Sequence, residues 1–141
     1  YIDTPQKYYF EDLGLRNARI GFRQVEETHL MENLIYNELR IRGYLVDVGV
    51  VPTRVKDADG AYRRSQLEVD FVCNRGSERV YVQSAYRLPT EEKRKQEMAS
   101  LLKIDDSFRK IIITEDLIKH HMDENGVEWV NVYDFLKSEE L

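Results

Sequence analysis

Apolar side chains recur at two different spacings along this chain, and the change of spacing predicts the order of its elements. A helical spacing predicts a helix over Glu27–Arg42, with Gly43 placed to end it. Alternation of β-branched and other residues then predicts a strand over Tyr44–Val51. The turn-forming run 57–60 comes next, so we expect a hairpin whose return strand is Gln66–Cys73.

The same patterns continue to the end of the chain. Ahead of the first helix we expect a short strand over Lys7–Phe10 and an irregular segment over 14–26. The whole order predicts the α/β class: one domain over residues 1–141, with a mixed central sheet flanked by helices on both faces. After the hairpin, the expected elements are a strand over Arg79–Tyr86, a helix over Thr90–Leu102, strands over Lys110–Thr114 and Glu128–Val132, and a helical segment over Val132–Lys137.

Composition limits the classes of protein to which the chain can belong. Its 141 residues are 42% hydrophobic and 33% charged, which suits a folded domain with a core of its own. No apolar run approaches the ~20 residues of a membrane helix, so we expect no membrane partner. The chain begins with neither an initiator Met nor a signal peptide, so we expect it to be a piece of a longer protein.

Charge and cysteine content narrow the chemistry further. The net charge of −5 argues against a broad, non-specific grip on DNA, although it is compatible with a local basic patch. The single cysteine, Cys73, excludes an internal disulfide and a multi-cysteine zinc site. A reducing cytoplasm is the simplest setting for such a chain.

Two carboxylates and one amide are placed to meet at a single position. Glu32 lies at the edge of the apolar stripe of the first helix, and Asp70 and Gln83 lie on strands that a tight turn makes neighbours. Oxygen ligands of this kind suit a hard cation such as Mg²⁺. Acids at a helix edge and a strand end are also typical of solvated surface positions, so spacing alone leaves both interpretations open.

Alternation along its strand sets the direction in which Asp70 points. With a period of two residues, Asp70 shares a face with Glu68 and Val72, while Val69 and Phe71 point to the opposite face. The acid of the first helix can reach Asp70 only if that helix packs on the same face.

Several segments, taken in order, resemble those of a known family. They are Lys7–Leu15, the acidic helix segment 31–39, the strands Glu68–Val72 and Tyr81–Ala85, and the aromatic-Leu segment Tyr133–Leu136. Together they resemble the PD-(D/E)XK nuclease-like superfamily, with a spacing similar to that of compact archaeal Holliday-junction resolvases. They resemble more closely the domain of unknown function at the C-terminus of many bacterial and archaeal AAA-type ATPases. The resemblance implies a restriction-endonuclease-like core joined to an upstream ATPase domain.

The resemblance also implies a mechanism, from which this chain departs. In active members, the helix acid and two strand acids hold Mg²⁺, and a lysine on the third strand stabilises the charge of the transition state. Glu32 and Asp70 match the first two acids, but Gln83 stands at the second strand acid and Ala85 at the lysine. We therefore expect little or no nuclease activity and no resident cofactor, with at most weak Mg²⁺ binding at Glu32, Asp70 and Gln83.

Three functions are compatible with these observations. The first is a non-catalytic accessory domain whose partners are its own ATPase domain and either nucleic acid or another protein. The alternatives are a Mg²⁺-dependent DNA nuclease or resolvase with a degenerate or migrated site, and a structural or oligomerisation module. The cations placed to contact nucleic acid are Arg63, Arg64, Arg87, Lys93, Arg94 and Lys95, and the last four could also replace the missing lysine.

Overall fold

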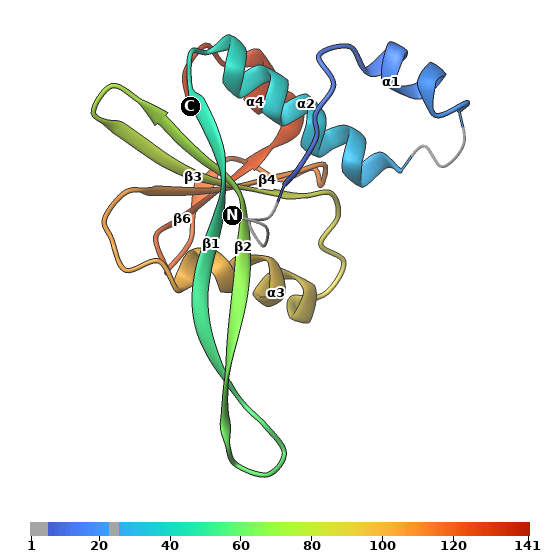
Figure 1. Ribbon diagram of the computed structural model, residues 1–141. Helices are drawn as coiled ribbons and strands as arrows, with labels where there is room; N and C mark the ends of the chain where they lie inside the picture. The colour runs from blue at the N-terminus through green and yellow to red at the C-terminus, as the bar shows by residue number, and fades with distance from the viewer. Residues whose placement is uncertain (1–5, 23–25) are drawn as a thin grey trace.

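A six-stranded mixed sheet forms the centre of the computed structural model, which describes residues 6–22 and 26–141 (Figure 1). The strands lie in the order β1-β2-β3-β4-β6-β5. The first three form an antiparallel meander, β3, β4 and β6 run parallel, and β5 is antiparallel to β6. Their bounds are β1 Leu45–Lys56, β2 Tyr62–Arg75, β3 Glu78–Ala85, β4 Arg109–Thr114, β5 His121–Met122 and β6 Val127–Asn131.

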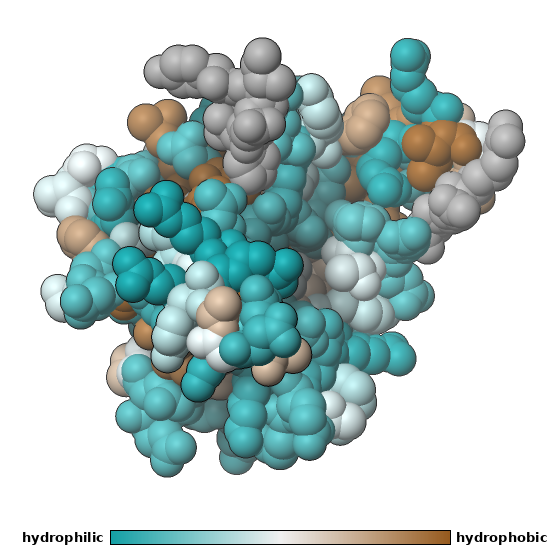
Figure 2. Space-filling model, turned by 60° about the horizontal axis from the view of Figure 1, so that its bottom comes forward, coloured by the Kyte–Doolittle hydropathy of each residue, from teal (hydrophilic) through white to brown (hydrophobic). Residues whose placement is uncertain are grey.

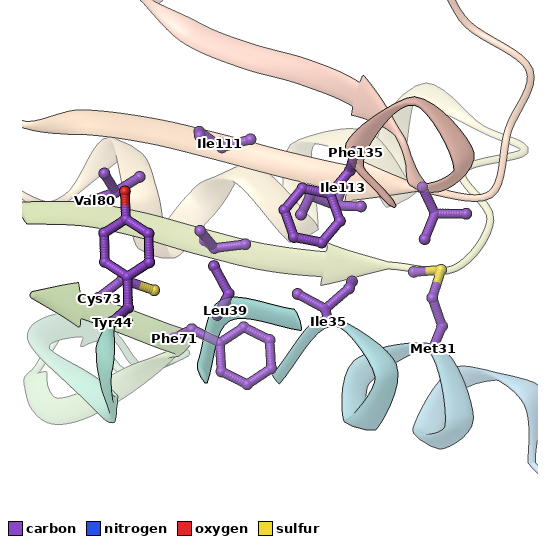
Figure 3. Packing of buried hydrophobic residues seen from close by; sticks show 12 residues of the cluster. Met31, Ile35, Leu39, Tyr44, Phe71, Cys73, Val80, Ile111, Ile113 and Phe135 are labelled. Carbon is purple, nitrogen blue, oxygen red and sulfur yellow. The ribbon is translucent and has the colours of Figure 1, made fainter. Parts of the chain in front are cut away.

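Helices cover both faces of this sheet, as the sequence predicts. On one face, α2 (Glu27–Ile41) and α4 (Val132–Lys137) bury a cluster that includes Ile35, Leu39 and Phe71 (Figure 3). On the other face, α3 (Glu91–Leu102) covers a second cluster around Trp129. The short helix α1 (Leu13–Arg19) lies beside α2, away from α3 (Figure 1). No helix within residues 6–22 and 26–141 combines the length and the apolar composition that a bilayer crossing requires.

Two features ahead of α2 differ from the sequence prediction. Lys7–Phe10 is not a strand, and the main-chain N–H and C=O of Phe10 hydrogen-bond to the side chains of Asn33 and Asn37 instead of to a neighbouring strand. The expected irregular segment 14–26 contains most of α1, which Asp12 caps by accepting a main-chain hydrogen bond. Residues 23–25 of that segment lie outside the described residues. Polar contacts, which a hydrophobic pattern does not register, determine both structures.

The β1–β2 hairpin is longer than the predicted strands Tyr44–Val51 and Gln66–Cys73. β1 continues to Lys56 and β2 begins at Tyr62, and the pairing runs from one end to the other. The extra pairs are polar and exposed, so they carry no alternation of apolar and polar residues from which a strand could be predicted. The strand β5 is also absent from the prediction, since a run of two residues is too short to show a period.

A β-bulge in β2 interrupts the alternation of faces directly after Asp70. Gly49 pairs with Val69 and Asp47 with Val72, so β2 has one residue more than β1 between these pairs. Val69 and Val72 consequently face α3, while Phe71 faces α2. The prediction that Asp70 and Val72 share a face is therefore wrong, as is the prediction that residues 69 and 71 do.

Candidate functional site

The ammonium group of Lys7 lies among three carboxylates that come from α2 and β2. Its Nζ is 2.6 Å from Glu68 Oε1, 2.8 Å from Asp70 Oδ1 and 3.0 Å from Glu32 Oε1. We call these four residues the Lys7 cluster. Their side chains are 22% exposed for Lys7, 15% for Glu32, 12% for Asp70 and 42% for Glu68. Glu32 and Asp70 are therefore mostly withdrawn from water, while Glu68 is exposed, and the ion pairs of Lys7 with Glu32 and Asp70 are stronger than surface pairs.

The segment that carries Lys7 is bound to α2 by main-chain hydrogen bonds and by an aromatic contact. Phe10 N–H donates to Asn33 Oδ1 at 2.9 Å, and Asn33 Nδ2 donates to Phe10 O at 2.7 Å. Tyr9 stacks on Tyr36 with ring centroids 4.2 Å apart. The Tyr9 hydroxyl also donates to Glu32 Oε1 at 2.7 Å. Lys7 is thus held in place by a segment that is itself bound to the helix carrying one of the acids.

The carboxylate of Asp70 is bound on its second oxygen by the main chain of β3. Ser84 N–H donates to Asp70 Oδ2 at 2.9 Å. Burial raises the pKa of Asp70, and the nearby Glu32 raises it further, while Lys7 and the Ser84 N–H act in the opposite direction. The ammonium and the amide therefore offset a large part of the cost of placing this carboxyl group away from water.

The carboxylates of the cluster raise the pKa values of both Lys7 and Tyr9. Burial alone would lower the pKa of Lys7, but its hydrogen bonds to Asp70, Glu68 and Glu32 raise that pKa overall. Burial and the hydrogen bond to Glu32 raise the pKa of the Tyr9 hydroxyl. At neutral pH the cluster therefore contains a protonated amine and a protonated phenol, both donating to carboxylates.

The structure places the predicted site residues on two different faces of the sheet. It brings Glu32 and Asp70 together, as expected, but the Gln83 side chain lies toward α3, where its Nε2 is 3.3 Å from Glu97 Oε2. Gln83 Oε1 accepts from the main-chain N–H of Asp70 at 3.2 Å, so it meets Asp70 through the backbone and not through the carboxylate. Ala85 is 3% exposed and packs in the cluster covered by α3. These two positions therefore serve the packing of the opposite face.

A metal at Glu32, Asp70 and Gln83 stays a prediction, and the donor geometry does not favour it. Gln83 Oε1 is engaged by an N–H donor, and the space between the carboxylates is taken by the Lys7 ammonium. Among the residues that the structure describes, no set of three or more His, Cys, Asp or Glu side chains is arranged to hold a metal ion.

Three of the six cations predicted to contact nucleic acid contact other side chains of the chain. Arg87 pairs with Glu115 at 3.1 Å, Lys93 pairs with Glu97 at 2.8 Å, and the Arg94 guanidinium lies 4.5 Å from the centroid of the Trp129 ring. Lys95 lines the same hollow as Arg94, which also contains Trp129. Arg63 and Arg64 lie elsewhere, on the exposed end of the β1–β2 hairpin.

The lone cysteine is a core residue and not a nucleophile. Cys73 is fully buried in the cluster covered by α2. Burial raises the pKa of its thiol to about 12, so the thiolate is not populated at neutral pH. This agrees with its position at the end of an apolar strand.

Sequence reasoning assigned no role to Lys7 and Glu68. Glu68 lies two residues before Asp70, so strand alternation gives both the same face, and that signal was present in the sequence. Lys7 is 63 residues away from Asp70 and belongs to a segment without strand or helix periodicity. Its only signal was its place in the segment Lys7–Leu15, which resembles the start of the ATPase-linked domains.

This chain has a distant likeness to a known protein. The chain is 32% identical over 136 residues to an uncharacterized protein of Haemophilus influenzae. The alignment covers 96% of this chain but 30% of that relative, so the chain spans less than a third of the relative's length. No protein-family model matches the sequence. No solved structure matches it either.

Proposed function

We propose that this chain is a non-catalytic, nuclease-like accessory domain of a cytoplasmic AAA-type ATPase, and that it acts by binding a partner. One observation carries the proposal: the Lys7 ammonium lies between Glu32, Glu68 and Asp70, where an active relative would need a hard cation. The domain supplies this cation from its own chain. A metal ion would have to displace an ammonium that makes three short ion pairs.

The rest of the Lys7 segment supports the same proposal. Displacing the ammonium would also disturb the hydrogen bond from Tyr9 to Glu32 and the paired bonds between Phe10 and Asn33. Each hydrogen bond of this kind contributes roughly 1 kcal/mol, and bonds to charged groups contribute more. The cluster therefore has a structural role: it holds the segment that carries Lys7 to α2.

The third strand supports it independently. A nuclease needs charge at the positions of Gln83 and Ala85, and losing one such electrostatic contributor typically lowers the rate about 10²–10³-fold. Ala85 supplies a methyl group to the packing against α3. A glutamate at position 83 would lie beside Glu97, whose carboxylate is 3.3 Å from the Gln83 amide nitrogen, so the amide avoids a like-charge contact.

DNA cleavage is the direct test. Labelled duplex, single-stranded and branched DNA are incubated with the chain in Mg²⁺ or Mn²⁺, alongside the variant Asp70→Asn. We expect no cleavage above the buffer control for either protein. Cleavage by the wild type that disappears in Asp70→Asn would overturn the proposal.

A Mg²⁺-dependent nuclease with a migrated lysine is the second candidate, and one observation favours it. Lys7 brings an ammonium to within 2.8 Å of Asp70 from a different segment, which is what a replacement for the missing strand lysine would have to do. Lys7→Met separates the two candidates. Under the second candidate, cleavage is present in the wild type and lost in both Lys7→Met and Asp70→Asn, while Lys103→Met, which changes an exposed lysine, keeps it.

The link to an ATPase rests on the resemblance and on the length of the relative. The Haemophilus protein has more than twice as much sequence outside the aligned region as within it, which leaves room for a further domain. A Gly-x-x-x-x-Gly-Lys-Ser/Thr motif in the full-length sequence upstream of Tyr1 is the expected finding. A full-length chain without such a motif would contradict this part of the proposal.

A further inference from the structure

The end of the β1–β2 hairpin projects from the body of the molecule as a two-stranded arm. Val51 is the last β1 residue packed against a core cluster, and the pairing continues from Pro52 opposite Gln66 to Lys56 opposite Tyr62. We call residues 52–66 the arm. Figure 1 shows it extending past α3, and Figure 2, which brings this end forward, shows mainly hydrophilic side chains there. At strand spacing, Pro52 to Lys56 spans roughly 14 Å.

One face of the arm concentrates positive charge. Arg54 lies directly opposite Arg64, and Lys56 lies opposite Tyr62, which is 71% exposed. Residues opposite each other in an antiparallel pair, and residues two apart on a strand, share a face. The two arginines, the lysine and the tyrosine therefore line the same face. The arm carries four basic and two acidic residues, a net charge of +2 in a chain whose net charge is −5.

The three cations of this face form no ion pair with an acidic side chain of the described residues. Within residues 6–22 and 26–141, neither Arg54, Lys56 nor Arg64 forms an ion pair, and the neighbouring Arg63 approaches Asp57 only to 3.8 Å. Like charges placed directly opposite each other destabilise a strand pair. The arm also has no buried apolar face with which to offset that cost, because its partly buried strand residues, Thr53 and Ser65, are polar and the others are exposed. An anionic partner would relieve the repulsion.

We propose that the arm binds duplex DNA by entering its major groove, with Arg54, Lys56 and Arg64 on phosphates. This inference rests on the proposed function and names the partner of that binding domain. The major groove of B-DNA is about 12 Å wide and about 8.5 Å deep and admits a two-stranded β-ribbon. The arm is long enough to reach its floor. The major groove of A-form RNA is too narrow for a ribbon, so duplex RNA is the poorer partner.

The test is fluorescence anisotropy with the whole chain and a labelled DNA duplex of about 20 base pairs at about 50 mM and about 200 mM KCl. Arg54→Gln/Arg64→Gln is compared with the matched control Lys119→Gln/Lys137→Gln, which removes the same charge from exposed sites outside the arm. We expect the arm variant to bind roughly tenfold more weakly or worse, and its plot of log affinity against log salt to be shallower by about 2. The control should bind like the wild type, and duplex RNA of the same sequence should bind more weakly than DNA.

Several outcomes would overturn the proposal. They are no binding to duplex DNA at the lower salt concentration, equal losses in the arm variant and the control, and tighter binding to duplex RNA. A chain that self-associates through the arm without binding DNA, seen by sedimentation of the wild type and the arm variant, would also overturn it. The cleavage assay is separate: DNA binding together with Mg²⁺-dependent cleavage would overturn the non-catalytic proposal and leave the arm as the binding site.

Discussion

The charges of the Lys7 cluster are paired with opposite charges, whereas the charges of the arm lie next to like charges. In the cluster, one ammonium meets three carboxylates, two of which are mostly withdrawn from water, and every member has a partner within 3.0 Å. In the arm, Arg54 and Arg64 are exposed and lie directly opposite each other. The cluster is complete within the chain, whereas the arm has charge that its own chain does not balance.

This difference indicates which region binds a partner. A site whose charges are already paired gains little from a ligand, because any ligand must first separate the existing pairs. An exposed region with like charges side by side gains from any polyanion that comes near. In an active nuclease the carboxylates would bind the ligand, whereas in this chain the unpaired charge of the hairpin favours binding there.

The largest effect should come from Lys7→Met, which leaves the carboxylates of the cluster without a cation. We expect the free energy of unfolding to fall by about 2–4 kcal/mol near neutral pH and low salt, because removing one partner of a poorly solvated ion pair leaves charge uncompensated. Urea unfolding measures it, with Lys103→Met as the control. Adding Asp70→Asn to Lys7→Met should recover part of the loss. A loss no larger than that of the control would show that the cluster does not stabilise the fold.

Gly49→Ala should have the next largest effect, since it acts on the bulge that separates the body of the sheet from the arm. A Cβ at position 49 would lie 2.7 Å from Val72 Cγ2 and 3.1 Å from Val69 Cβ. Relief of this contact requires repacking beneath α3, so we expect a loss of about 1–3 kcal/mol in urea unfolding. Val50→Ala, at an exposed neighbouring position, is the matched control. Equal stability of the two variants would mean that the bulge tolerates a side chain.

The pH dependence of the cluster should follow from the raised pKa of Lys7. Its pKa is raised above 10.5 in the folded chain, so its stabilising contribution is complete below pH 10.5 and is lost as the pH rises toward the raised value. The difference in unfolding free energy between wild type and Lys7→Met should stay constant up to about pH 10 and then shrink by no more than about 1.4 kcal/mol per pH unit. A difference that begins to shrink near neutral pH would contradict the ion-pair assignment.

The smallest effect should come from Arg64→Gln in the arm. Removing one of two opposed arginines relieves repulsion, so we expect thermal stability to be unchanged or slightly higher, within about 0.5 kcal/mol. Arg75→Gln on the same strand is the control: it removes a pair with Glu78 and a stacking contact with Tyr44, so it should destabilise. A destabilised Arg64→Gln variant would mean that the arm uses its charge within its own chain, which would weaken the contrast with the cluster.

Periodicity predicted most of the body of the fold. The expected helix over Glu27–Arg42 is α2, the expected helix over Thr90–Leu102 is α3, and the apolar strand over Lys110–Thr114 is the buried β4. These elements each bury an apolar face, so their sequences carry the period of the structure. The regions that differ, Lys7–Phe10 and the far end of the hairpin, hold their shape through polar side chains or main-chain pairing alone, which leave no such period.

By itself, the sequence determined the α/β class and the helices on both faces, because both follow from hydrophobic burial, and it left open whether Glu32 and Asp70 meet. Only the tertiary structure decided which cation those acids meet and which way the third strand presents Gln83 and Ala85. Lys7 comes from a segment far away in the chain, and no local pattern encodes a contact of that kind. The bulge opposite Gly49 interrupts the alternation directly after Asp70, so that Phe71 and not Val72 shares its face, because a single inserted residue exchanges the two faces of a strand.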